Sequence, residues 1–257
     1  MPSYHPISRT RHATLFWSRH RNYAHAKQAQ IAPLVWAEVA KAAVEYPIGF
    51  IVKNQSAELV CLLGIESEKC LFVGQNNAWQ GQYIPAAFRS FPFALCPDEQ
   101  GKPVLCIDEH SGLTSPETGD ERFFTPEGSV SPALQSILDF LSTINASKTA
   151  TQTMTQALLN HGVLTPWPIT LETSNGKKQL EGLHRIDEAA LNAISHDALL
   201  QLHSTKALAL AYYQLLSQQH LPKLATLYEL HQKTTAKPTQ IAHQLNDDEG
   251  ISFDEFY

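Results

Sequence analysis

The chain has 257 residues, of which 43% are hydrophobic, so it can bury a core and is too apolar for a disordered chain. Its net charge of −6 argues against sequence-independent nucleic-acid binding, which requires a basic face. No apolar run approaches the roughly 20 residues of a membrane helix, so no integral membrane segment is expected.

The first thirty residues are polar and basic and show no sustained periodicity. Four arginines follow the start without an apolar core behind them, which is not the pattern of a secretory signal: Arg9, Arg11, Arg19 and Arg21. We therefore expect a cytoplasmic protein, although export without a signal peptide remains open. Residues 1–30 are predicted to form a basic arm or edge element, residues 31–232 an α+β domain and residues 233–257 a flexible acidic tail.

The segment from about 47 to 108 is predicted to form a mostly antiparallel sheet, with a helix from Pro33 to about Glu45 on one face. Short apolar runs joined by polar turns leave no room for crossover helices, which favours hairpins. The runs lie at 48–52, 59–65, 70–73, 95–96 and 104–108.

The second half is predicted to be helical with one additional hairpin. An exposed loop at 109–130 leads to two helices, from about 131 to 145 and from about 148 to 161. Asn175-Gly176 between two short runs predicts a hairpin over 169–183. Asp187 can cap a short helix, helices follow at 197–203 and 205–231, and Pro222 breaks the last one. The fold class expected is therefore α+β.

The segment from Trp79 to Phe93 is the strongest candidate for a binding site. It holds five aromatic residues, two prolines and a single charge, Arg89. Prolines do not suit a core strand, so we predict an aromatic wall formed by Trp79, Tyr83, Arg89, Phe91 and Phe93. Arg89 could clamp a carboxylate or phosphate or could tie the fold internally. Trp79 and Tyr83 could stack on a sugar, an indole or a peptide side chain, or could form a core pair.

Other kinds of site find little support. The spacings of the four cysteines fit neither zinc pairs nor a redox motif, which favours buried reduced thiols: Cys61, Cys70, Cys96 and Cys106. His20 and His25 are too far apart for a helical metal-binding pair. No nucleophile elbow or glycine-rich phosphate loop occurs. No metal or cofactor is therefore expected, and no catalytic residue can be named.

Several segments together resemble the SapC family, named after a bacterial surface-layer-associated protein. The resemblance runs from about Pro33 to Leu227 and is most specific over Trp79–Phe93. The other segments that carry it are 46–50, Leu63-Gly64, 71–73, 124–128, 162–164, Asn175-Gly176 and Leu180–Glu188. It implies a soluble bacterial protein with a surface-layer role. Relatives are often encoded beside flavin-dependent halogenase-like proteins and TonB-dependent outer-membrane receptors, which implies a possible partner of either kind and a nutrient pathway. No catalytic residues come with the resemblance.

The leading hypothesis is a non-catalytic binding or accessory protein. Its aromatic and arginine wall would hold a peptide, glycan or small anionic ligand, or dock a partner protein. The alternative is an enzyme with an unrecognised His- or Arg-based site in the same nutrient pathway. A third, weaker hypothesis is a scaffold that works through its helical half.

Overall fold

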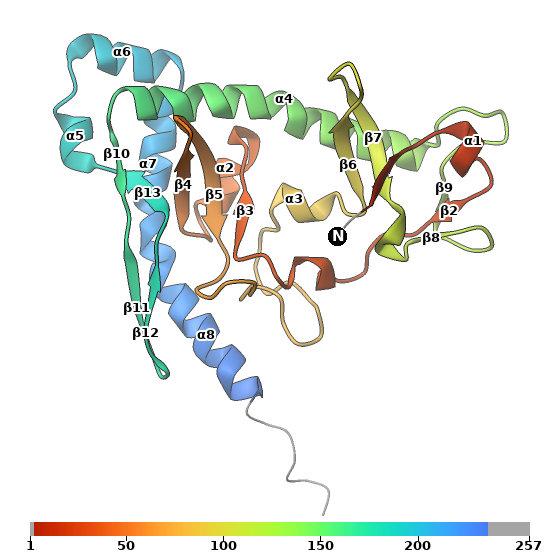
Figure 1. The fold of residues 1–257 in the computed structure, drawn as a ribbon, viewed down its shortest axis with the longest axis horizontal. Helices are drawn as coiled ribbons and strands as arrows, with labels where there is room; N and C mark the ends of the chain where they lie inside the picture. Colours follow the sequence, from red (N-terminus) through yellow and green to blue (C-terminus); the bar gives the residue numbers. More distant parts are fainter. Residues whose placement is uncertain (1–2, 236–257) are drawn as a thin grey trace, which may run out of the picture.

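A five-stranded antiparallel sheet forms the centre of the computed structural model, which describes residues 3–235 (Figure 1). The order of its strands is β10-β13-β4-β5-β3. Their bounds are Leu164–Pro166 (β10), Leu183–Ile186 (β13), Ile48–Lys53 (β4), Ser56–Leu62 (β5) and Ile31–Pro33 (β3). Of the single sheet predicted at about 47–108, only β4 and β5 belong to this sheet. Strand β3 precedes that segment, and the second half of the chain adds β10 and β13.

The described residues also form three smaller antiparallel sheets. Strand β7 lies between β1 and β6, strand β2 lies between β8 and β9, and β11 pairs with β12 as the predicted hairpin. Their bounds are Tyr4–Pro6 (β1), Phe16–Trp17 (β2), Phe93–Pro97 (β6), Pro103–Asp108 (β7), Thr114–Ser115 (β8), Glu121–Arg122 (β9), Ile169–Thr173 (β11) and Gly176–Leu180 (β12).

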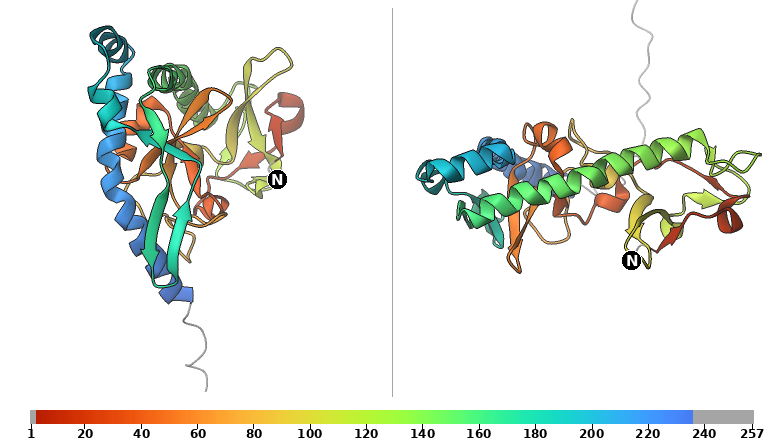
Figure 2. Two further views of the ribbon diagram at one scale, coloured as in Figure 1. Left: turned by 60° about the vertical axis from the view of Figure 1, so that its left-hand side comes forward. Right: turned by 90° about the horizontal axis from the view of Figure 1, so that it is seen from above.

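Helices cover the central sheet, and most of them come from the second half of the chain (Figures 1 and 2). The α-helices are Arg9–His12 (α1), Trp36–Ala42 (α2), Ala86–Arg89 (α3), Pro132–Asn160 (α4), Glu188–Asn192 (α5), His196–Ser204 (α6), Ala207–Ser217 (α7) and Leu221–Thr235 (α8). Three 3-10 turns lie at Ala24–Ala26 (η1), Glu109–Ser111 (η2) and Gln218–His220 (η3). The predicted α+β class is confirmed.

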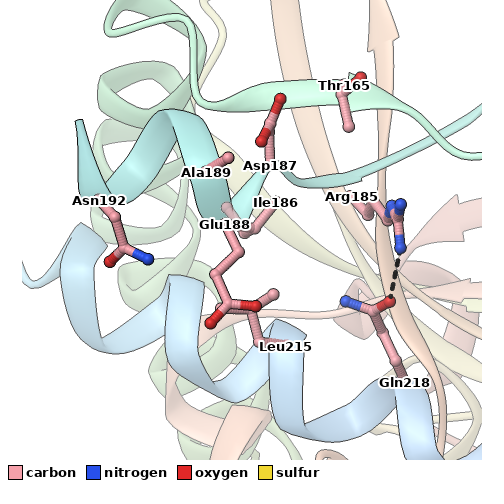
Figure 3. Close-up of a pocket in the computed structure, with 9 residues that line it drawn as sticks. All are labelled: Thr165, Arg185, Ile186, Asp187, Glu188, Ala189, Asn192, Leu215 and Gln218. Atoms are coloured by element: carbon pink, nitrogen blue, oxygen red, sulfur yellow. Dashed lines mark hydrogen bonds between the residues drawn. The ribbon is translucent and has the colours of Figure 1, made fainter. Parts of the chain in front are cut away.

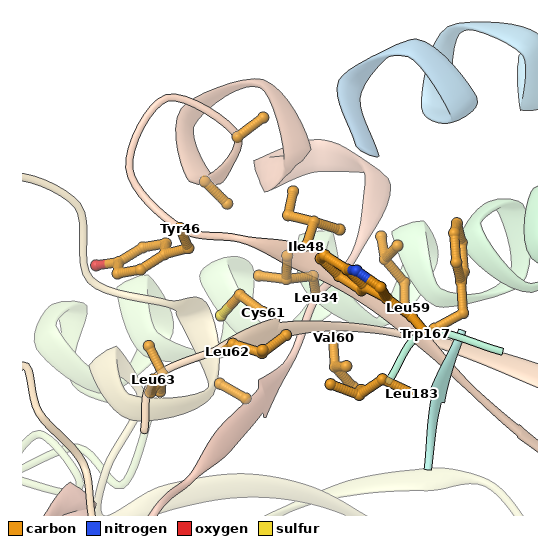
Figure 4. Packing of buried hydrophobic residues seen from close by; sticks show 14 of the residues in the cluster. Leu34, Tyr46, Ile48, Leu59, Val60, Cys61, Leu62, Leu63, Trp167 and Leu183 are labelled. Atoms are coloured by element: carbon orange, nitrogen blue, oxygen red, sulfur yellow. The ribbon is translucent and has the colours of Figure 1, made fainter. Parts of the chain in front are cut away.

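The long helix α4 connects two separate hydrophobic clusters. The central cluster fills the space between the central sheet and its helices, and Met154 and Leu158 of α4 belong to it; Figure 4 shows part of its packing around Ile48 and Trp167. The second cluster contains Trp17, Phe93, Ile107, Phe123, Phe124, Leu134 and Leu141. Figure 2 shows α4 running along the length of the molecule past both groups of strands.

Three predicted assignments of helices and strands were wrong. Pro33 ends strand β3, and α2 begins only at Trp36. The run 70–73 forms no strand; it is buried, and Val73 makes an isolated bridge to Trp79. The two helices predicted at 131–161 are one continuous helix, α4.

The predicted exposed loop at 109–130 contributes η2, β8 and β9, and Phe123 within it is fully buried. Within residues 3–30, β1 pairs with β7 at the edge of its sheet, and Trp17 is buried in the second cluster. The division into arm, domain and tail stays a prediction. Most of the predicted tail, residues 236–257, lies outside the described residues.

Candidate functional site

The predicted wall, Trp79–Phe93, passes from the central cluster to the second cluster. The half-buried Trp79 ring stacks on Phe72 with 6.0 Å between ring centroids and meets Tyr23 edge-on at 5.6 Å. Its indole N–H donates to the Tyr83 carbonyl oxygen at 3.0 Å and to the Tyr46 hydroxyl at 3.1 Å. The indole N–H of Trp79 therefore makes its hydrogen bonds within the fold.

Tyr83 is attached to helix α2 through Glu38. The Tyr83 hydroxyl donates to Glu38 Oε2 at 2.8 Å, and the Ala86 amide donates to the same oxygen at 2.8 Å. Glu38 is only 3% exposed, so these donors offset the cost of burying its charge. Burial, together with the Glu38 carboxylate, raises the pKa of Tyr83. The phenol thus remains a hydrogen-bond donor at neutral pH.

A second buried carboxylate, Glu45, holds the backbone just before this ring. Glu45 accepts hydrogen bonds from the Gln82 amide at 2.9 Å and from the Tyr83 amide at 2.6 Å, and Lys223 of α8 pairs with it at 3.1 Å. These residues border a hollow of about 320 Å³, called here the Tyr83 hollow. It is lined by Lys41, Val44, Glu45, Gln82, Tyr83 and Lys223.

Arg89 is exposed at the end of α3. Its Nη2 donates to the Tyr83 hydroxyl at 3.3 Å, and its guanidinium carbon lies 5.5 Å from the Tyr83 ring centroid and 4.8 Å from that of Phe140. Within residues 3–235 no ion pair joins Arg89 to an acidic side chain. The internal tie considered from the sequence therefore exists through Tyr83, and it leaves donors of the guanidinium accessible to solvent.

Phe91 and Phe93, the last two residues of the predicted site, lie in different surroundings. Phe91 is half-buried and stacks on His25, with ring centroids 4.1 Å apart and planes inclined by 10°. Phe93 is 2% exposed and meets Trp17 edge-on at 4.8 Å in the second cluster. Four of the five predicted site residues are therefore at least partly exposed: Trp79, Tyr83, Arg89 and Phe91. Phe93 is too buried to contact a ligand.

Sequence reasoning missed a histidine pair beside the wall. The rings of His20 and His25 lie 5.1 Å apart, His20 Nδ1 lies 2.8 Å from the Phe91 carbonyl oxygen, and His25 Nε2 lies 3.2 Å from that of Phe88. Burial lowers the pKa of His25 to about 4, so this imidazole is neutral at pH 7. Helical spacing could not reveal the pair, because His20 precedes the 3-10 turn η1 and His25 lies within it.

No three His, Cys, Asp or Glu side chains of the described chain are grouped as a metal site would require. Similarly, none of the helices described in residues 3–235 is both long and apolar enough to span a bilayer.

A larger hollow of about 780 Å³ lies at the end of strand β13, next to α5 and α7 (Figure 3). We call it the Arg185 hollow; its lining includes Thr165, Arg185, Asp187, Glu188, Asn192 and Gln218. Asp187 caps α5 as predicted, accepting from the Ala190 amide at 3.0 Å. The motif Leu180–Glu188, one of the segments that resemble the SapC family, contributes Arg185, Asp187 and Glu188 to this hollow. Its sequence alone did not indicate that a hollow lies there.

A family model described as SapC matches residues 7–224. This match includes both hollows and the whole of the Trp79–Phe93 segment. No curated protein and no solved structure matches the chain.

Proposed function

The chain belongs to the SapC family, and we propose that it is a non-catalytic binding or accessory protein that recognises an anionic group through Arg89 and Tyr83. The observation that carries this proposal is the exposed Arg89 guanidinium, oriented by two rings and bonded to Tyr83. A planar guanidinium held in this way can donate two parallel hydrogen bonds to a carboxylate or phosphate.

The charges around Tyr83 favour an anionic ligand over a neutral one. Arg89 lies at the hydroxyl end of the ring, and Lys41 and Lys223 line the hollow beside it. The two buried carboxylates, Glu38 and Glu45, are already occupied by donors of the fold. Of the peptide, glycan, small anionic ligand and partner protein expected from the sequence, an acidic peptide segment or small anion suits these groups best.

The partner that we propose is one of those implied by the family: a flavin-dependent halogenase-like protein, a surface-layer component or an outer-membrane receptor. An accessory protein would present Arg89 to an acidic patch on such a partner. The cytoplasmic location expected from the sequence stays a prediction.

The test is an affinity pull-down from a lysate of the source bacterium with quantitative mass spectrometry. Three variants are compared with the wild type: Arg89→Ala, Arg89→Lys and the control Arg122→Ala. Arg122 is also exposed and lies 4.4 Å from a ring centroid, that of Phe16, but it is outside the wall. We expect a partner that is lost with Arg89→Ala, partly retained with Arg89→Lys and unaffected by the control, with binding that weakens as salt increases.

Equal recovery of every protein by wild type and folded Arg89→Ala would contradict this function. So would a partner lost to the same degree with Arg122→Ala, because the loss would then reflect general surface charge.

The second candidate function is an enzyme of the same nutrient pathway. Its supporting observation is that His20 and His25 lie against the carbonyls of Phe91 and Phe88, on either side of Arg89 in the chain. Incubation of wild type and His25→Gln with a metabolite extract of the source bacterium tests it. A compound consumed only by the wild type would support an enzyme, and unchanged extracts would favour the accessory protein.

A further inference from the structure

The Arg185 hollow has a volume suited to a small ligand. At about 780 Å³ it falls within the range of roughly 300–1,000 Å³ typical of ligand pockets. Its walls come from four elements: Thr165 from β10, Arg185 from β13, Glu188 from α5 and Leu215 from α7.

Buried hydrogen bonds fix the two main walls relative to each other. Gln214 of α7 is fully buried; it accepts from the Ile186 amide of β13 at 2.9 Å and donates to the Ile48 carbonyl of β4 at 3.1 Å. Ser217, one turn further along α7, accepts from the Ile48 amide at 2.9 Å. Because breaking such buried bonds is costly, the separation of β13 and α7 is set by the fold before any ligand arrives.

The hollow is lined by one cationic side chain, Arg185, and two acidic ones, of which Asp187 caps α5 and Glu188 lies away from Arg185. Figure 3 shows Arg185 and Gln218 on one side, joined by a hydrogen bond of 3.3 Å, and Glu188 and Asn192 on the other. Among residues 3–235 neither Arg185 nor Glu188 forms an ion pair. Gln218 uses one donor of the guanidinium and leaves the others available.

We propose that the Arg185 hollow binds a short zwitterionic peptide. Arg185 would receive the peptide carboxylate, and Glu188, with Asn192 beside it, would receive the ammonium group. The volume exceeds the need of one small amino acid, and the apolar lining by Ile186, Ala189 and Leu215 provides contacts for the short chain between the two charges. This site is separate from Arg89 and does not depend on the function proposed there.

The experiment measures binding of four forms of trialanine by calorimetry or NMR titration: with free termini, acetylated, amidated, and blocked at both ends. The wild type should bind the free peptide best and the doubly blocked peptide least. Each blocked terminus should weaken binding about five- to tenfold, the value of a charge-assisted hydrogen bond open to solvent.

Two variants assign the ends of the peptide. Arg185→Gln should abolish the preference for a free carboxylate while keeping the preference for a free ammonium group, and Glu188→Gln should do the reverse. Matched controls, Arg122→Gln and Glu181→Gln, remove exposed charges outside the hollow and should change neither preference. Thermal unfolding of each variant verifies that it is folded.

Equal affinity for all four peptides, or no binding of the free peptide at millimolar concentrations, would overturn the proposal. A loss of both preferences in either single variant would also overturn it, since the two ends would then not be read separately. Because Arg89→Gln should leave these titrations unchanged, failure here is distinguishable from failure of the accessory function.

Discussion

Glu45 accepts a hydrogen bond of 2.6 Å from the backbone amide of Tyr83, which connects the turn after α2 to the centre of the predicted wall. Through the same carboxylate Lys223 connects α8 to this point. The orientation of Tyr83, and with it that of Arg89, therefore depends on a residue that no ligand needs to touch.

Replacing Glu45 by Gln tests this dependence. A glutamine would direct its amide NH₂ at one of the two backbone N–H groups and would leave Lys223 without its counter-charge. We expect a loss of about 2 kcal/mol in the free energy of unfolding, measured by urea denaturation. Glu58→Gln removes an exposed carboxylate on β5 and should stay within about 0.5 kcal/mol of the wild type; equal effects of both would contradict the role assigned to Glu45.

Phe93 and Phe91 should respond differently to truncation, although only one residue separates them. Phe93 is buried beside Trp17, so Phe93→Ala should cost about 3–5 kcal/mol of unfolding free energy. Phe91 is half-buried on His25, so Phe91→Ala should cost about 1–2 kcal/mol. Chemical denaturation of both variants checks the order, and similar losses would show that the two rings share one environment.

His25 should make the fold sensitive to acid. Burial lowers its pKa from 6.5 in the unfolded chain to about 4 in the fold, so the unfolded chain takes up its proton first as the pH falls. The stabilising contribution is complete above about pH 6.5 and is lost progressively towards pH 4. Burial also lowers the pKa values of His12 and His231, so His25 accounts for part of the total slope.

The measurement is the melting temperature of wild type and His25→Gln across this pH range. Glutamine keeps a donor for the Phe88 carbonyl but cannot titrate, so the variant should show a flatter decline. The exposed His196 provides the control His196→Gln. Parallel curves for wild type and His25→Gln would mean that another group carries the acid sensitivity.

The four cysteines should differ in their rate of alkylation. Burial raises the pKa of Cys70 and of Cys106 to about 11 and raises that of Cys61 as well, whereas Cys96 is the one of the four that is not fully buried. Because the thiolate is the reactive form, iodoacetamide should label Cys96 first in the native protein. Peptide mass spectrometry follows the order, and in denaturant all four should react; early labelling of Cys61 would contradict the burial.

Local signals explain the elements that the sequence predicted well. Asn175-Gly176 specifies the β11–β12 hairpin, and Asp187 caps α5, because each depends on residues only a few positions away. The partners of Arg89 could not be predicted in this way. Phe140 lies on α4, and Glu38, which holds Tyr83, lies on α2, so only the tertiary fold brings these residues together.

Helix α4 shows why a continuous element was predicted as two. Leu134 and Leu141 face the second cluster, whereas Met154 and Leu158 face the central cluster. At 3.6 residues per turn the two apolar stripes point in directions that differ by about 130°. A single stripe is the usual sign of a helix packed on one core, so a change of face near residues 142–150 resembles the junction of two helices in the sequence.

The continuity of α4 also constrains how this sequence can change over evolution. Substitutions on its exposed faces alter neither cluster, but inserting or deleting one residue between Leu141 and Thr151 would turn one end of the helix by about 100° relative to the other. The two clusters would then no longer both meet their apolar side chains. Length variation among related chains should therefore accumulate in turns such as 98–102 and 174–176 and should spare the middle of this helix.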